Sequence, residues 1–144
     1  MPSAIKTTTE ALQEVHAAIL DDLGKLPGAA AASSPEALIG LRARLAEAHK
    51  QVTEHFRSEE EGGVLAGIEK CEPRFKRGVQ HLVDEHSRLM QWLDALISQA
   101  GAATQMNESI RAGIRTWLDK VRDHESRENK LVEDAILTDV GSGD

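Results

Sequence analysis

Apolar residues recur at intervals of three and four along four long segments of the chain, with polar residues between them. This spacing is typical of amphipathic α-helices, which bury one face and expose the other. It predicts helices over residues 4–24, 35–61, 73–99 and 107–138. Because the connections between them are short, neighbouring helices should run antiparallel. We therefore expect residues 1–144 to form a single domain with an all-α fold, an up-down-up-down four-helix bundle.

Residues near the ends of these segments support the predicted helices. Ser34 is a favourable N-cap and Pro35 a favourable first-turn residue for the second helix. Residues 64–71 lie between the second and third helices and are expected to form a short helical turn. Their apolar side chains cover either the end of the bundle or the surface of a partner. From Gly141 onwards we expect a frayed tail.

Polar side chains interrupt the apolar stripes of the second and fourth helices at corresponding places. The stripe of the second helix leads from Val52 to His55 and, four residues later, to Glu59. The stripe of the fourth helix leads in the same way to His124 and then Glu128. Residues four apart lie on the same face of a helix, so both histidine–glutamate pairs should point into the bundle.

The first and third helices each direct one histidine inward as well. In the third helix His86 continues the stripe that begins at Val79. In the first helix His16 lies on a predicted stripe that comprises Ile5, Leu12, Val15, Ile19 and Leu23. The interior of the bundle should therefore contain four imidazoles and two carboxylates.

Such a group of buried polar residues requires compensation. An ionised carboxylate in an apolar interior costs several kcal/mol unless it is paired, and no lysine or arginine lies on the same stripes. Two metal ions meet this requirement, because imidazole and carboxylate are suitable ligands for iron, manganese and zinc. Two neighbouring cations repel each other unless anions lie between them, which suits Glu59 and Glu128 to a bridging role.

A single histidine on an apolar stripe is more often a hydrogen-bonded core residue than a ligand, and one HxxxE motif is a weak signal. His81 and Glu85 have the same spacing, but His81 lies off the stripe, so we expect this pair to form a surface contact. His49 lies at the edge of its stripe, so we do not expect it to bind metal. Glu85 and Glu125, which adjoin His86 and His124, are candidates for additional carboxylates around the site, but they lie about 100° from the stripes, which favours a surface position. The joint placement of one inward histidine per helix is what favours a metal site.

Composition narrows the functional classes. The formal net charge of -7 argues against binding to nucleic acid or to an anionic membrane surface. No apolar run is long enough to span a bilayer, and the N-terminal region lacks an apolar signal segment, so cytoplasmic residence is the default expectation. Cys71 is the single cysteine, which excludes an internal disulfide. The absence of tyrosine excludes a tyrosyl radical or a tyrosinate ligand.

Taken together, these motifs resemble the hemerythrin-like family, the HHE cation-binding domains, over nearly the whole chain. The matching residues are His16 in EVHAAIL, His55 and Glu59 in HFRSEEE, His86 in DEHSRLM, and His124 and Glu128 in HESRENKLVEDAI. The resemblance implies a non-haem centre of two iron ions (Fe2+/Fe3+) joined by an oxo or hydroxo bridge. The first two histidines would bind one iron, the last two the other, and the glutamates would bridge them.

The sequence departs from the invertebrate oxygen carriers of this family in two places. Those proteins have HxxxH in the third helix, whereas Leu82 and Met90 flank His86 at these positions. They have HxxxxD in the fourth helix, where this chain has HxxxE. With one histidine fewer, reversible oxygen carriage is not expected. The pattern instead resembles members linked to iron sensing, peroxide breakdown, or nitric oxide and iron–sulfur repair.

Three functional hypotheses follow. The first is a di-iron protein that binds or reacts with oxygen, nitric oxide or peroxide. The second is an iron-sensing or metal-storage module without turnover, in which metal binding orders the bundle. The third is a metal-free or zinc-bound structural bundle. No nucleophile–base pair, phosphate loop or ferritin-type ExxH motif occurs, so any catalysis would belong to the metal. The sequence leaves homo-oligomerisation open.

Overall fold

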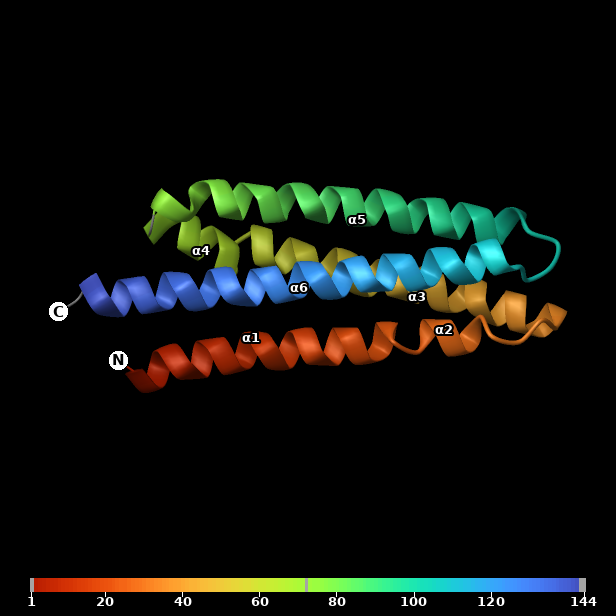
Figure 1. Ribbon diagram of the computed structural model, residues 1–144, viewed down its shortest axis with the longest axis horizontal. Coiled ribbons are helices and arrows are strands. Elements are labelled where there is room, and N and C mark those ends of the chain that lie inside the picture. Colours follow the sequence, from red (N-terminus) through yellow and green to blue (C-terminus); the bar gives the residue numbers. More distant parts are fainter. Residues whose placement is uncertain (1, 72, 143–144) are drawn as a thin grey trace.

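The computed structural model describes the backbone of residues 2–71 and 73–142 and the side chains of residues 10–68, 70 and 73–137. Within these residues the chain is helical and contains no strand. Four long helices lie side by side (Figure 1): α1 (Pro2–Leu23), α3 (Pro35–Glu60), α5 (Lys76–Ala102) and α6 (Glu108–Ser142). Three short elements lie in the connections: α2 (Leu26–Ala29), α4 (Val64–Cys71) and the 3-10 helix η1 (Pro73–Phe75).

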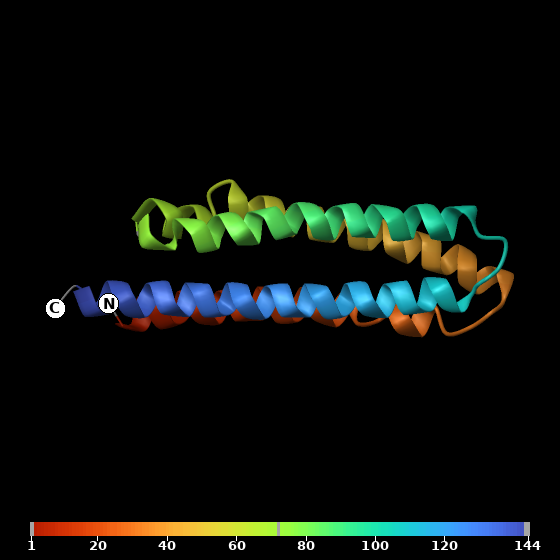
Figure 2. The same cartoon turned by 45° about the horizontal axis from the view of Figure 1, so that its top comes forward.

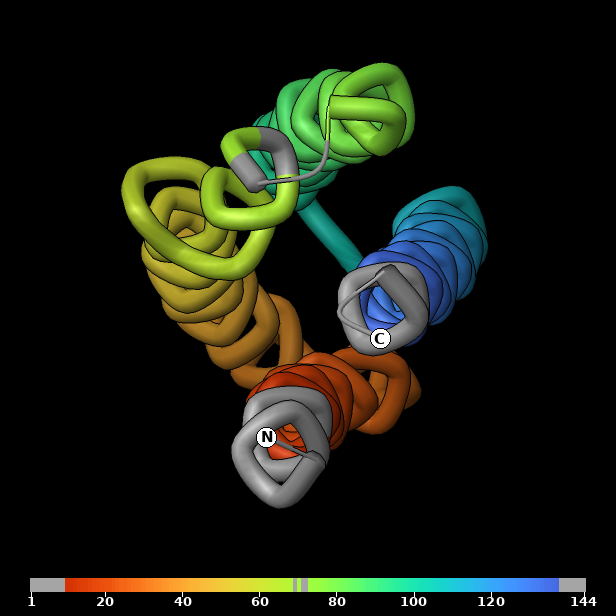
Figure 3. The backbone as a smooth tube through the Cα atoms, turned by 90° about the vertical axis from the view of Figure 1, so that its left-hand side faces the viewer, coloured from red at the N-terminus to blue at the C-terminus, as the bar shows by residue number. Residues whose placement is uncertain are grey.

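Successive long helices run in opposite directions, and both chain ends lie at the same end of the bundle (Figure 1). Each long helix packs against two others, in the cyclic order α1, α3, α5, α6 (Figure 3). In Figure 2 this arrangement appears as two layers, α1 with α6 and α3 with α5. The prediction of an all-α, up-down-up-down bundle is therefore confirmed. No helix in the described part of the chain has both the length and the apolarity needed to cross a bilayer.

Several helix boundaries differ from the predicted ones. The first helix ends at Leu23, and a separate turn, α2, follows, because Pro27 lacks the backbone N–H that a continuous helix would need there. The third long helix begins after the 3-10 turn that contains Pro73. The last helix continues through Gly141 to Ser142, so the expected tail from Gly141 is wrong as far as the described residues extend.

The start of α3 has the predicted cap. Ser34 adopts an extended conformation, and its Oγ accepts a hydrogen bond from the Ala37 backbone N–H at 3.1 Å. Pro35 occupies the first turn, where a missing N–H costs nothing. At the start of α6, Asn107 Oδ1 accepts a bond from the Ile110 N–H at 2.9 Å. Side chains thus satisfy backbone donors that the helices leave unpaired at their N-termini.

Replacing Ser34 with alanine should lower the free energy of unfolding by about 1 kcal/mol, because the Ala37 N–H loses its acceptor. Urea denaturation followed by circular dichroism would measure the change. Ser34→Asp is the matched control, since its carboxylate can accept the same bond and should keep nearly all of the stability. Equal losses in both variants would show that the cap contributes nothing.

The apolar interior has two parts. A large cluster, centred on Trp117, fills the half of the bundle that includes α2 and the start of α3. The Trp117 side chain is fully buried, and its Nε1–H donates to the Leu89 carbonyl at 3.0 Å. A smaller cluster at the other end comprises Leu65, Ile68, Val79, Leu82, Val132 and Ala135. Because Leu65 and Ile68 of α4 are buried in it, segment 64–71 covers the end of the bundle.

The inward face of α1 differs from the predicted stripe. Val15 is 51% exposed, whereas its neighbour His16 is buried. Leu12 is partly buried four residues before His16, and Leu23 is buried seven residues after it. Since adjacent helical residues point about 100° apart, a face centred on His16 turns Val15 to solvent. The predicted inward position of Val15 is therefore wrong, and the side chain of Ile5 lies outside the described residues.

Candidate metal centre

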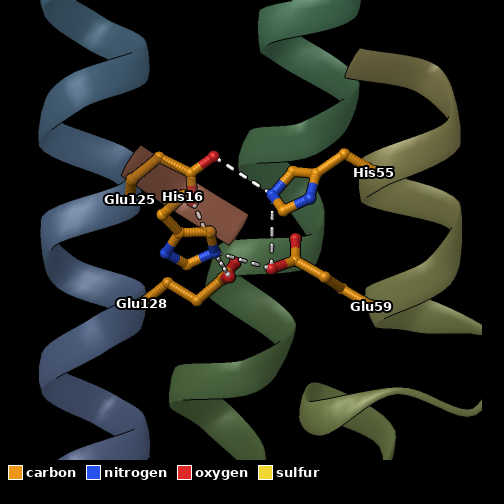
Figure 4. A group of neighbouring side chains, drawn as sticks. All are labelled: His16, His55, Glu59, Glu125 and Glu128. Carbon is orange, nitrogen blue, oxygen red and sulfur yellow. Dashed lines mark hydrogen bonds and ion pairs between the residues drawn. The ribbon is translucent and has the colours of Figure 1, made fainter. Parts of the chain in front are cut away.

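A layer of polar side chains separates the two apolar clusters. Each of the four long helices contributes to it, and Figure 4 shows five of its members pointing toward one another. The layer comprises His16 of α1, His55 and Glu59 of α3, His86 of α5, and His124, Glu125 and Glu128 of α6. None is more than 9% exposed. The structure thus brings together all six residues that the stripes predicted, with Glu125 in addition.

The first half of this layer is built around His16 and His55. The Nε2 atom of His16 faces three carboxylates, at 2.8 Å from Glu128 Oε1, 2.9 Å from Glu125 Oε2 and 3.1 Å from Glu59 Oε2. The Nε2 atom of His55 lies 3.2 Å from Glu125 Oε1 and 3.5 Å from Glu59 Oε2. A ring nitrogen donates at most one proton, so it cannot satisfy three carboxylates at once.

The second half is built around His86 and His124. The Nε2 atom of His86 lies 3.4 Å from Glu59 Oε1 and 3.7 Å from Glu128 Oε2. The Nε2 atom of His124 lies 3.4 Å from Glu128 Oε2. Glu59 and Glu128 therefore each direct one carboxylate oxygen to the first histidine pair and the other oxygen to the second pair. This is the arrangement that two bridging carboxylates require.

Three of the four imidazoles are held from outside the layer through Nδ1. The partners are Asn129 Oδ1 for His16 at 2.8 Å, Glu60 Oε2 for His86 at 2.6 Å and Glu85 Oε1 for His124 at 2.9 Å. An acceptor at Nδ1 places the proton on that nitrogen and leaves Nε2 with its lone pair directed inward, as a metal ligand needs. These outer contacts fix both the tautomer and the ring orientation.

Glu85 belongs to this outer set and is not a surface residue as predicted. Its side chain is only 14% exposed, and it also accepts a hydrogen bond from Arg127. Burial favours the neutral acid, but Arg127 and His124 outweigh burial and hold the pKa of Glu85 below its usual range. The ionised carboxylate of Glu85 is therefore a strong acceptor for the His124 Nδ1–H.

Phe56 forms an apolar wall beside the second histidine pair. Its ring stacks on that of His86, with centroids 3.8 Å apart and planes inclined by 7°. It also meets the His124 ring at a steep angle, with centroids 5.5 Å apart. Phe56 is itself only 3% exposed, so an apolar ring is packed firmly against this histidine pair.

The chemistry of this donor set fits a pair of metal ions. Eight buried atoms lack a hydrogen bond of regular geometry within the described residues: Nε2 of His55, His86 and His124, Oε1 of Glu59, and both oxygens of Glu125 and Glu128. Two ligand atoms that each lie about 2.1 Å from the same metal ion, with an angle of about 90° between the two bonds, are about 3.0 Å apart. The separations within the layer, from 2.8 to 3.7 Å, are close to this spacing.

The charges in the layer support the same fit. Burial disfavours the protonated imidazoles of His16 and His86, but the surrounding carboxylates outweigh it and raise the pKa of His16 to about 12 and that of His86 to about 10. Burial alone would raise the pKa of Glu128, yet the facing histidines hold it well below its usual range. Without metal, protons on His16 and His86 offset part of the carboxylate charge, and metal binding has to displace these protons.

Glu125 is the residue that the single-stripe interpretation of the fourth helix missed. It was expected at the surface but is 1% exposed. The helix α6 packs against both α1 and α5, so its buried face is wider than one stripe. The missed signal is a second stripe at seven-residue spacing, in which buried Leu118 and Val132 flank Glu125.

The other two histidines lie outside the layer, as expected. His49 is 38% exposed, with Nε2 2.9 Å from Asp94 Oδ1. His81 is 61% exposed, and its Nε2 lies 3.8 Å from Glu85 Oε2. Neither reaches the buried carboxylates, so the spacing HxxxE at His81 does not by itself mark a site.

Comparison with known proteins agrees with this geometry. The model of the hemerythrin HHE cation-binding domain matches residues 7–136, which include every member of the polar layer. No curated protein and no solved structure gives a significant match. Because the family model covers most of the sequence, the chain belongs to the hemerythrin HHE cation-binding domain family.

Proposed function

We propose that this chain binds two iron ions in the polar layer, and that the resulting centre binds or reacts with a small ligand such as oxygen, nitric oxide or peroxide. The observation that carries the proposal is the shared orientation of Glu59 and Glu128. Each gives one oxygen to the pair His16 and His55 and the other oxygen to the opposite histidine pair. Membership of a cation-binding family supports it independently.

The types of ligand in the polar layer favour iron over a zinc ion with a purely structural role. A mixed imidazole and carboxylate set that does not fill six positions around both ions suits iron chemistry, whereas structural zinc sites are closed and tetrahedral. Iron would supply one-electron redox chemistry and coordination positions for the small ligand. The protein would orient the imidazoles through Asn129, Glu60 and Glu85, and the Phe56 ring would hold His86 by stacking on it.

Anaerobic reconstitution with Fe(II) tests this proposal. We expect two irons per chain by elemental analysis, and near-ultraviolet and visible absorption of a di-ferric centre after exposure to air. Oxygen release from added hydrogen peroxide would favour peroxide breakdown as the activity. If the protein holds no iron, or one loosely bound ion that Glu59→Gln leaves unaffected, the di-iron function is wrong.

A second candidate function, iron sensing without turnover, is favoured by the way α1 is attached to the bundle. Within residues 10–18, His16 is the one fully buried side chain, and Leu12 is partly buried while the rest are exposed. Residues 10–18 of α1 are thus held largely through the polar layer. Metal binding would fasten this helix, and metal loss would release it.

Replacing His16 with alanine should therefore lower both the iron content and the melting temperature, because α1 loses its buried anchor. Val15→Ala is the matched control, since the neighbouring Val15 is 51% exposed and should change neither. Hydrogen exchange should show protection of α1 that depends on iron in the wild type. Equal protection of α1 with and without iron would contradict the sensing function.

A further inference from the structure

Carboxylates are distributed unequally between the two histidine pairs. Both oxygens of Glu125 face the first pair, with Oε2 at 2.9 Å from His16 Nε2 and Oε1 at 3.2 Å from His55 Nε2. Each bridging glutamate gives one oxygen to either side. At their inward Nε2 atoms, the first pair therefore faces three carboxylates, whereas the second pair faces two.

Glu125 is a buried carboxylate with few protein partners. It is 1% exposed, and neither oxygen has a hydrogen bond of regular geometry within the described residues. In the same part of the chain its ion-pair contacts are with the two histidines alone, and no lysine or arginine approaches it. Burying an ionised carboxylate in this way is unfavourable unless a cation lies beside it.

We propose that Glu125 is an additional metal ligand, specific to the ion that His16 and His55 hold. This inference rests on the two-metal function proposed above. That ion then has five protein ligands, and the ion held by His86 and His124 has four. With six positions around each ion, the second retains more open positions, so a small ligand from solvent binds there.

Two cavities of the molecule border the second histidine pair. A cavity of about 380 Å³ between α3 and α5 is lined by Phe56, Glu60, His86 and Met90, among others. A second hollow, of about 300 Å³ between α5 and α6, borders His124. Both border histidines of the second pair, the side on which we place the ion with more open positions.

Iron titration of Glu125→Gln tests the ligand role. Two ions should bind the wild type, whereas in the variant one should bind as before and the other at least about tenfold more weakly. Glu133→Gln, on an exposed glutamate of the same helix, is the matched control and should bind both ions normally. Glu125→Asp keeps the charge and should recover part of the affinity, which separates a ligand from a packing role.

Mössbauer spectra of protein loaded with iron-57 test the inequality of the two positions. We expect two distinct signals in the wild type and the loss or change of one in Glu125→Gln. Azide serves as a small-ligand probe. When it is added to the wild type, it should shift the signal of the ion held by His86 and His124, which is the signal that Glu125→Gln retains.

Three results would overturn the inference, and they are distinguishable. Wild-type protein without bound iron would remove the two-metal function and this inference together. Two ions bound with unchanged affinity and spectra in Glu125→Gln would leave the di-iron function intact but show that Glu125 is not a ligand. Azide acting on the signal that the variant loses would place the open position at His16 and His55 instead.

Discussion

Replacement of Glu128 with glutamine is expected to reduce the bound iron from two ions per chain to at most one. The two oxygens of Glu128 face opposite histidine pairs, at 2.8 Å from His16 Nε2 and 3.4 Å from His124 Nε2. Two divalent ions about 3.5 Å apart repel each other by roughly 20 kcal/mol at an effective dielectric constant of about 20. A neutral amide removes one of the two anions that offset this repulsion.

Elemental analysis after anaerobic reconstitution would measure this loss. Glu133→Gln is again the appropriate control, because Glu133 lies on α6 but makes only an exposed hydrogen bond with Gln13. Glutamine has nearly the volume of glutamate, so the variant should keep its helical content. Two firmly bound irons in Glu128→Gln would show that this carboxylate does not bridge.

Removal of the metal by a chelator is expected to lower the melting temperature by roughly 10–20 °C. A ligand that binds only the native state at a hundred times its dissociation constant stabilises that state by about 2.7 kcal/mol. Two such ions contribute about 5 kcal/mol, and each kcal/mol shifts the melting temperature of a domain of this size by about 3–4 °C. Metal-free protein must instead keep its three buried carboxylates beside protonated histidines.

Thermal unfolding followed by circular dichroism, with and without chelator, would measure this shift. In Glu128→Gln, which should hold little metal, the same chelator should change the melting temperature much less. A large chelator effect in that variant, or none in the wild type, would contradict the coupling of metal binding to stability.

The sequence predicted the fold and six residues of the polar layer because both depend on the periodic spacing of inward-facing residues along each helix. A histidine such as His86 that replaces an apolar residue on a stripe must face the interior once the helix packs. The end of the first helix was predicted to within one residue, but the short helix α2 was not predicted, since it depends on how Pro27 and its neighbours fold in the connection that follows. Val15 was predicted to face inward because the predicted stripe of the first helix included it, whereas the buried face is centred on His16.

Glu125 and the outer partners of the histidines needed the three-dimensional structure. The burial of Glu125 depends on α6 packing between two other helices, which widens its buried face beyond one stripe. Asn129, Glu60 and Glu85 contact histidines on neighbouring helices, so their roles depend on the relative rotation and height of those helices. The spacing of residues along a single helix does not determine how that helix is rotated or shifted relative to its neighbours.

The position of the polar layer between two unequal apolar clusters has a consequence for the kinetics of metal exchange. The smaller cluster, which α4 covers, contains six buried apolar residues, whereas the larger surrounds Trp117. Local opening of the smaller end exposes far less apolar surface than unfolding the whole bundle, so it requires less free energy. Ions can then enter or leave from the α4 end while the Trp117 half stays folded, so exchange is faster than global unfolding.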